Sequence, residues 1–587
     1  MGQESTATSA QQARAGSRWD TVPPGRRLLA VAHNVTAATR LLDLLRVVGG
    51  DRRVATSFTS PGSSAFPDGL TEFFDARGIV HLPWADAVAQ RFDAAISTSR
   101  GGELHALQAA LIYTPHGAGF NKTLPSESAH RIPGPGAFGL TRDWLVHDGA
   151  VVPSVLLVSH HEQIDRLRLD CPEAVPRAVV AGDPCADQLA AARPFRAAYR
   201  AALGVPDGVA LVVVSSTWGP ASLLGAAPQV VERAVAELPV DEYRVLLAVH
   251  PNVWHRHSPW QVRSWLAPLL DAGLLLPEPS TEDWKCALIA ADCLLGDHGS
   301  LTAYGSWMRL PTLLGAFDKA SVAPGSPMET LGRVLPRFAA DLPLAGQLRR
   351  AAADVLRLAE AAEASCVTSE PGGAAAVLRQ VVYRTLGLDE PAGSATVPVP
   401  ALPSSHNAAA PAPRPYHAAQ LVHAVRETGN RIRVRRYAHP ARGPHIPADA
   451  VLVADASEPN PSVANNAEIL IASPPAGHST APPQTAWALD LLTRHPGCRA
   501  AAAPGRPGAW CVWARTGRNH VRELHATTDP DGSTPALPSM IAAAALLAWL
   551  DAVDTSEHPQ IEVSAGPALT ARLTIDVTST SFDLPPH

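Results

Sequence analysis

The chain has 587 residues, enough for two to four domains at roughly 150 residues each. Its 48 Lys and Arg against 54 Asp and Glu, a net charge of −6, argue against a nucleic-acid binder that neutralises many phosphates. Seven cysteines form no C-x-x-C pair, and the first twenty residues lack the apolar core of a signal peptide, so we expect a reduced, cytoplasmic protein.

Composition divides the chain into a main body and a C-terminal unit. A stretch rich in Pro, Ala and Ser separates the two and predicts a linker, because such residues cannot order a core. The predicted units are a disordered tail (1–22), two Rossmann-like domains (23–203 and 204–389), the linker (390–415), an accessory α/β domain (416–575) and a tail (576–587).

Short apolar runs alternate with helical stretches through the main body. Each run precedes a polar turn and an amphipathic helix, which predicts parallel strands in βα units. The fold expected for this region is therefore α/β, a pair of doubly wound domains. Ligands of such sheets bind beyond the carboxyl ends of the strands. The runs are Arg27–Ala32, Ile79–Leu82, Ala94–Ser97, Leu111–Tyr113, Val155–Ser159 and Ala178–Ala181, then Ala210–Val214, Val245–Val249, Leu274–Leu276, Cys293–Leu295 and Thr312–Leu314.

The turn after Leu111–Tyr113 reads Thr-Pro-His-Gly-Ala-Gly and places His116 at a strand end. A histidine there, followed by glycines that let a ligand approach the backbone, is a candidate general base; the alternative is a histidine that only caps the strand. A similar loop forms the oxyanion hole of α/β-hydrolases. That class needs a G-x-S-x-G elbow, and the chain has none.

The next two strand ends carry a carboxylate and a row of hydroxyls. Asp187 closes the sequence Gly-Asp-Pro-Cys-Ala-Asp after Ala178–Ala181, where it faces a ligand or caps the following helix. Thr217 stands in Ser-Ser-Thr-Trp-Gly after Ala210–Val214, a turn that could hold a phosphate.

His250 follows the run Val245–Val249 and precedes a proline. With His255 and His257 it raises the question of a metal site, but the three lack helical i,i+4 spacing and have no Cys or carboxylate neighbour. We therefore expect no metal and interpret His250 as a donor to a phosphate or hydroxyl.

The last candidate turn, Gly-Asp-His-Gly-Ser, follows Cys293–Leu295 and ends in Ser300 at the start of a helix. Asp297 and Ser300 at a strand-to-helix turn favour an anion site, because free backbone N–H groups face the ligand there. An ordinary helix cap is the alternative.

In this order the motifs resemble those of the CDP-glycerol glycerophosphotransferases of teichoic-acid synthesis and their GT-B relatives, over roughly residues 105–318. The resemblance implies that His116 deprotonates an acceptor hydroxyl while His250 and Ser300 hold the donor pyrophosphate. It places the other candidates in the same cleft: Asp187, Thr217 and Asp297, with Lys122 as a possible phosphate contact.

The chain departs from this family at two arginines that contact phosphate. The family's Pro-Thr-Trp-Arg corresponds to Ser216–Gly219, and its Gly-Tyr-Pro-Arg-Asn-Asp corresponds to Gly182–Asp187. These losses motivate one alternative, a catalytically decayed module that binds a nucleotide or a protein partner. A second alternative is a nucleotide-sugar 2-epimerase-like enzyme, because Asp297–Ser300 also resembles an Asp-Ser-Gly-Gly turn.

The leading hypothesis is a GT-B-like transferase of cell-envelope or polysaccharide biosynthesis that needs no cofactor. It would pass a glyceryl-phosphate, polyol-phosphate or sugar unit from a CDP- or UDP-linked donor to a hydroxyl acceptor. Acceptors of the family are lipid-linked, so a peripheral location at the inner membrane face stays open.

The C-terminal unit shows strand-like runs at Ala450–Ala454, Ile469–Ala472 and Trp510–Ala514. Helices are expected at Tyr416–Glu427 and Met540–Val553. The apolar run of the second helix is shorter than the ~20 residues that span a membrane, so we interpret it as a helix buried inside the unit. The unit is expected to have a partner-binding or regulatory role.

Overall fold

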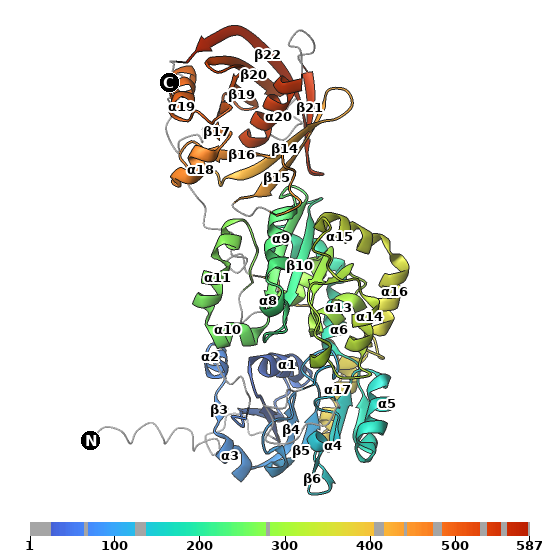
Figure 1. Ribbon diagram of the computed structural model, residues 1–587. Coiled ribbons are helices and arrows are strands. Elements are labelled where there is room, and N and C mark those ends of the chain that lie inside the picture. Colours follow the sequence, from blue (N-terminus) through green and yellow to red (C-terminus); the bar gives the residue numbers. More distant parts are fainter. Residues whose placement is uncertain are drawn as a thin grey trace, which may run out of the picture.

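The computed structural model describes residues 25–63, 69–123, 137–277, 282–403, 416–439, 443–472, 484–528, 537–552 and 560–584. The predicted tail 1–22 and the end of the predicted linker, 404–415, lie outside the described residues. The described residues form three units, two with parallel sheets and one with a closed barrel. Figure 1 shows them stacked along one axis, with the second parallel sheet in the middle.

The first sheet has seven strands, all parallel, in the order β3-β2-β1-β4-β5-β8-β9. The apolar runs predict every strand except β2, whose sequence VATSFT mixes polar and apolar residues. The strand order reverses between β1 and β4, which makes this edge a topological switch point. The strands are β1 (Arg26–Val31), β2 (Val54–Thr59), β3 (His81–Leu82), β4 (Arg91–Ser97), β5 (Gln108–Tyr113), β8 (Val155–Val158) and β9 (Ala178–Val180).

Helices cover this sheet, and a two-stranded hairpin lies beside it. Helix α1 (Val35–Leu45) follows β1 directly; Asn34 caps it by accepting a hydrogen bond from the backbone N–H of Ala37, and its apolar face is buried. The other elements of this unit are α2 (Leu70–Asp75), α3 (Trp84–Ala89), α4 (Arg142–Leu145), β6 (Val146–His147), β7 (Ala150–Val151) and α5 (His161–Asp170). The next helices, α6 (Pro184–Ala192) and α7 (Arg196–Ala202), pack their apolar side chains in the core of the second parallel sheet.

The second sheet has the order β11-β10-β12-β13, again all parallel, with a switch point between β10 and β12. The predicted run Leu274–Leu276 makes only an isolated bridge, from Leu275 to Leu246. The strands are β10 (Ala210–Ser216), β11 (Tyr243–Val249), β12 (Cys293–Gly296) and β13 (Thr312–Leu314). The helices are α8 (Leu223–Ala226), α9 (Gln229–Glu237), α10 (Pro251–His257), α11 (Pro259–Asp271), α12 (Asp283–Ala290), α13 (Ser300–Trp307), α14 (Pro327–Val334), α15 (Leu344–Ala353) and α16 (Val355–Ala364). The predicted pair of doubly wound sheets is confirmed.

The last helix of the body, α17 (Ala374–Leu386), returns to the first sheet. Leu378, Val382 and Tyr383 pack in the same core as the side chains of β1 and β4. Arg26 Nε also donates to the carbonyl of Leu386 at 2.6 Å. This helix, predicted as part of unit 204–389, therefore packs against the first sheet, at the beginning of the main body.

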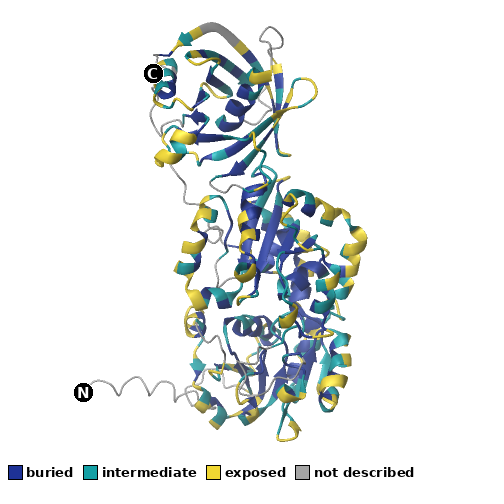
Figure 2. Ribbon diagram, viewed as in Figure 1, coloured by how far each residue is buried: buried dark blue, intermediate teal, exposed yellow. Residues whose placement is uncertain are grey.

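The C-terminal unit is a closed barrel and not the predicted small α/β domain, with the order β14-β15-β21-β22-β20-β19-β18-β17-β16. Helix α20 (Ser539–Ala552) runs through its core, buried among the inner faces of the strands (Figure 2). A helix that is apolar on every side needs apolar cover on every side, and the strands provide it by closing around α20. The strands are β14 (Gln420–Arg426), β15 (Arg431–Ala438), β16 (Val451–Asp455), β17 (Ile469–Ile471), β18 (Ala500–Pro504), β19 (Ala509–Arg515), β20 (His520–Thr528), β21 (Gln560–Ala565) and β22 (Leu569–Asp583); two outer helices are α18 (Pro461–Asn466) and α19 (Gln484–Arg494).

Two further expectations for this unit are wrong. The helix predicted over Tyr416–Glu427 is strand β14, which pairs antiparallel with β15 and β16. Strand β22 continues past residue 576, the predicted start of a tail, because it pairs with β20 as far as Asp583. The three predicted strand runs are confirmed as β16, β17 and β19.

The barrel rests on the second sheet unit through polar contacts from β15. Arg436 pairs with Asp241 at 2.5 Å, and Arg435 pairs with Glu242 at 3.1 Å. The predicted linker also contacts the main body, because the Tyr199 hydroxyl donates a hydrogen bond to the carbonyl oxygen of Pro400 at 2.6 Å. Among the described helices, none is long and apolar enough to cross a membrane.

Candidate functional site

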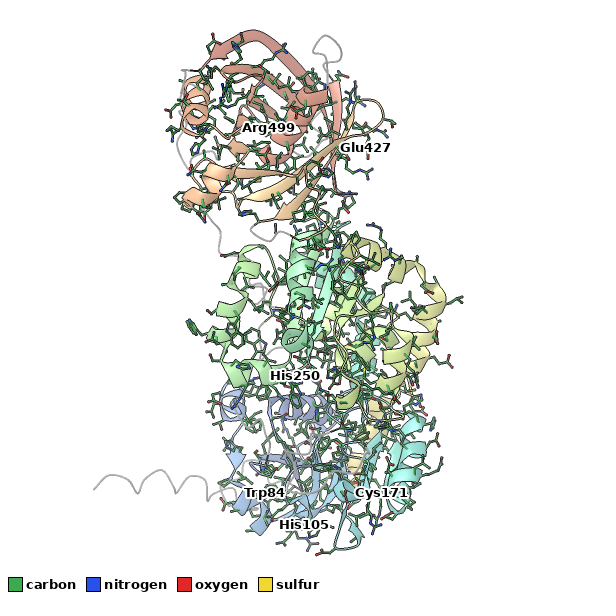
Figure 3. All side chains as sticks on the ribbon, in the orientation of Figure 1. Trp84, His105, Cys171, His250, Glu427 and Arg499 are labelled. Atoms are coloured by element: carbon green, nitrogen blue, oxygen red, sulfur yellow. The ribbon has the colours of Figure 1, made fainter. Side chains whose placement is uncertain are left out.

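A cavity of about 440 Å³ lies between the carboxyl ends of the two parallel sheets. The turns after β1, β4 and β5 form one wall, and the turns after β10, β11 and β12 form the other. Five of the predicted site residues line it: His116, Lys122, Thr217, His250 and Ser300. Figure 3 shows His250 at the junction of the two sheet units. The walls approach closely, since a Cβ added to Gly117 would lie 2.5 Å from Ser300 Oγ.

The two predicted aspartates do not line the cavity. The Asp187 carboxylate caps α17 by accepting from the backbone N–H groups of Gly372 at 2.7 Å and Ala374 at 3.0 Å. Asp187 therefore caps a helix that is distant in sequence and does not line the cavity; the following helix, α6, is capped by Asp183 and not, as the alternative had it, by Asp187.

Asp297 is fully buried beneath the cavity floor. Its carboxylate accepts from the backbone N–H groups of Thr217 at 2.7 Å, Leu223 at 3.0 Å and Gly299 at 3.0 Å. It therefore shapes the turns after β10 and β12 from below and does not face the cavity itself.

His116 presents a free base nitrogen. Its Nδ1 lies 3.0 Å from the carbonyl oxygen of Thr98, which can only accept, so Nδ1 carries the proton and Nε2 keeps its lone pair. Burial lowers the pKa of His116, and the positive charges of Lys122 and Arg40 lower it further. The ring is therefore neutral at physiological pH, in the tautomer that a general base through Nε2 requires.

His250 has the opposite tautomer. It caps α10, and its Nδ1 accepts from the backbone N–H of Asn252 at 3.1 Å, so the proton is on Nε2. Burial lowers the pKa of His250 well below its ordinary value, and the nearby Lys122 and His116 act in the same direction. His250 is therefore a neutral donor through Nε2. Among the described residues, no group of three or more His, Cys, Asp or Glu side chains could hold a metal ion.

The wall around His250 carries further donors. Helix α13 begins at Ser300 with no side chain capping its N-terminus, which leaves its first N–H groups for an anion. Lys122 reaches across from the first unit, where its Nζ donates to Thr217 Oγ1 at 2.8 Å and lies 5.0 Å from the ring of Trp218. This side of the cavity suits a phosphate or diphosphate.

The sequence analysis missed a buried polar network that joins the two units. Asp183, and not Asp187, is its centre: it accepts from Arg40 of α1 at 2.9 Å and from the Tyr304 hydroxyl of α13 at 2.8 Å. It also caps α6.

A second part of the network centres on Lys285 of α12. Its Nζ donates to Asp43 of α1 at 2.6 Å, to Gln188 at 2.8 Å and to Glu282. Lysine is rare in this chain, at Lys122, Lys285 and Lys319 only, but rarity alone does not tell the buried Lys285 from the exposed Lys319.

His33 is a further residue that the sequence analysis missed, although it follows β1 as His116 follows β5. It lines the cavity and is 2% exposed, and its Nε2 lies 2.6 Å from the carbonyl oxygen of Gly101. Burial lowers the pKa of His33 to about 4, and the nearby His116 adds to this shift.

We expect His33 to make the stability of the protein depend on pH. Because its pKa is about 4 in the folded chain and 6.5 in the unfolded chain, the unfolded chain binds the extra proton between these values. Stability present above pH 6.5 is therefore lost as the pH falls towards 4, by about 3 kcal/mol for this residue. Urea unfolding at neutral pH and near pH 5 measures the effect: the difference between wild type and His33→Gln should shrink as the pH falls. A constant difference would contradict the assignment.

Comparisons with known proteins give matches only among solved structures. No family model and no curated protein matches the sequence. The wall teichoic acid polymerase TagF, in a structure soaked with CDPG, is 15% identical with a TM-score of 0.43, over 63% of this chain and 90% of that one.

Two other matches are similarly distant. S. aureus MnaA with UDP is 10% identical with a TM-score of 0.38, over 63% of this chain and 99% of that one. A putative UDP-N-acetylglucosamine 2-epimerase from Listeria monocytogenes is 12% identical with a TM-score of 0.39, over 63% and 99%. Similarities this weak say nothing about activity, so the site is interpreted from its own geometry.

Proposed function

We propose that this chain is a GT-B-like transferase that moves a glyceryl-phosphate, polyol-phosphate or sugar unit from a nucleotide-diphospho donor to a hydroxyl acceptor. The observation that supports it best is the pair of neutral histidines in one cavity. His116 offers a lone pair on Nε2, and His250 offers a proton on Nε2. A transfer to a hydroxyl needs both roles at once, a base for the acceptor and a donor for the leaving group.

In the proposed reaction the acceptor oxygen attacks the donor while His116 Nε2 takes the hydroxyl proton. A new bond forms between that oxygen and the transferred unit, and the bond to the nucleotide leaving group breaks. His250, Ser300 and the first N–H groups of α13 stabilise the charge that develops on the leaving group. Lys122 adds a positive charge on the same side, where the family's arginines are missing.

The carboxylates of the cavity favour a transferase over an epimerase-like enzyme. Among the described lining residues only Asp43 and Glu282 are carboxylates, and both bind Lys285. Neither is left free as a catalytic acid or base. For the barrel we keep the binding of a protein partner as its proposed role.

The proposal predicts that His250→Asn weakens nucleotide binding at least tenfold. The asparagine oxygen can still cap α10 in place of Nδ1, but the variant has no donor in place of Nε2–H. Calorimetric titration with CDP and UDP measures the loss, and His257→Asn, at the exposed end of the same helix, is the matched control.

A second measurement separates an enzyme from a binding module. Consumption of CDP- and UDP-linked donors in the presence of hydroxyl acceptors is expected for the wild type. Nucleotide binding without any donor consumption would favour the decayed, partner-binding alternative. Unchanged nucleotide affinity in His250→Asn would contradict the donor site.

A further inference from the structure

The cavity wall formed by the first sheet carries three buried side-chain atoms that no described residue satisfies. They are His33 Nδ1, Thr36 Oγ1 and Arg40 Nε, and all three residues line the cavity. Leaving a buried polar group unpaired destabilises the protein. Such a group at the wall of a cavity indicates a ligand atom that completes its hydrogen bonding.

His33 can only accept a hydrogen bond from that ligand. Its Nε2 carries the proton, because the neighbouring carbonyl oxygen of Gly101 accepts from it at 2.6 Å. The ring stays neutral at physiological pH, because burial lowers the pKa of His33 to about 4. Its Nδ1 therefore attracts a hydroxyl or N–H group and repels the lone pairs of a phosphate or carboxylate oxygen.

His33 lies beside the proposed catalytic base. It follows β1, and the carbonyl that orients His116 belongs to Thr98, which follows β4. Strands β1 and β4 are neighbours at the switch point of the first sheet. A ligand that presents one hydroxyl to His116 therefore has His33 as a neighbour for another.

Two of the three Arg and Lys side chains that line the described cavity are ion-paired. Arg40 pairs with Asp183 at 2.9 Å, and Lys285 pairs with Asp43 at 2.6 Å. Lys122 donates to Thr217 on the opposite wall. Lys122 lies with the proposed donor phosphate, so the wall around His33 offers neutral hydrogen-bonding groups and the Nε–H of Arg40, whose charge Asp183 already neutralises.

We infer that this wall binds a neutral polyol or sugar as the acceptor, with one hydroxyl donating to His33 Nδ1 while His116 deprotonates a second. The inference rests on the proposed function and names its acceptor class. It also excludes an acceptor whose phosphate would have to lie against this wall.

The variant His33→Gln tests the inference. Its amide N–H can replace Nε2–H opposite Gly101, whereas its amide oxygen lies one bond further from the backbone than Nδ1 and does not take the place of that acceptor. His161→Gln, on the exposed start of α5, is the matched control. Saturation-transfer NMR on the full chain measures the binding of glycerol, ribitol and methyl glucoside against glycerol 3-phosphate, without any donor.

We expect at least one neutral probe to bind the wild type about tenfold or more tightly than glycerol 3-phosphate. His33→Gln should lose this affinity by about tenfold, while its thermal unfolding stays cooperative and its CDP and UDP binding stays unchanged. Equal or tighter binding of glycerol 3-phosphate would overturn the inference. Unchanged polyol binding in His33→Gln, or a parallel loss of nucleotide binding, would also overturn it.

The test is independent of turnover. If no donor is ever consumed, the proposed transferase fails, yet polyol binding that depends on His33 still supports the ligand class. If donors are consumed with phosphorylated acceptors alone, the transferase stands and the inference fails.

Discussion

Replacing His116 with asparagine is expected to lower kcat by roughly 10²- to 10⁴-fold, the usual contribution of a general base. The asparagine N–H can keep the hydrogen bond to the Thr98 carbonyl, so the turn retains its shape while Nε2 is lost. The affinity for the nucleotide donor should change little, because His250, Ser300 and Lys122 remain. Donor consumption and calorimetric titration with CDP and UDP measure the two quantities separately.

The expected pH profile gives this prediction a second test. Because burial lowers the pKa of His116, the wild-type rate should stay on its plateau down to a pH below 6.5 and then fall as Nε2 becomes protonated. The residual rate of His116→Asn should lack this acidic limb. Full activity in the variant would remove His116 from the mechanism.

Replacing Lys285 with methionine should reduce the free energy of unfolding by about 3–5 kcal/mol, because it leaves buried carboxylates without their cation. Lys285 is 2% exposed and bridges Asp43 of the first unit and Glu282 of the second. Methionine keeps most of the volume and removes the charge. Urea unfolding with two independent probes measures the change.

The chain supplies a control for this variant. The side chain of Lys319 is 81% exposed and lies 3.6 Å from Glu329, so Lys319→Met should cost no more than about 1 kcal/mol. The double variant Lys285→Met with Asp43→Asn should be more stable than Lys285→Met alone, because it removes one unpaired charge. Equal losses for the two lysine variants would show that the buried pair adds nothing.

Much of the candidate site follows from a local rule. Parallel strands end at the same edge of a sheet, so polar residues just after apolar runs converge on one place. This rule predicted the positions of His116, Thr217 and His250 in one cavity. The same rule applied to the first apolar run would also have found His33, because this histidine stands just after the run Arg27–Ala32.

The rule could not choose between the two carboxylates of one turn. Asp183 and Asp187 stand four residues apart after β9, and either spacing fits a ligand site. Only the return of α17, whose first N–H groups bind Asp187, decides that this residue is a cap. Asp183 is then the residue that meets Arg40 and Tyr304.

The short apolar segments of the C-terminal unit did not determine its secondary structure or its fold. The residues of β14, QLVHAVR, fit a helical face as well as a strand, because apolar residues fall at both spacings. Pairing with β15 and β16 makes the segment a strand. Closure of the sheet around α20 then produces a barrel in place of the predicted α/β domain.

The sequence by itself determined the two parallel sheets and the residues at their carboxyl ends, because hydrophobic periodicity and strand ends are properties of neighbouring residues. The tertiary structure alone decided which charges pair, since Lys285 and Asp43 lie 242 residues apart. It also decided the tautomers of His116 and His250. Each depends on a backbone group that the fold places beside the ring, and those tautomers give the two histidines their different chemistry.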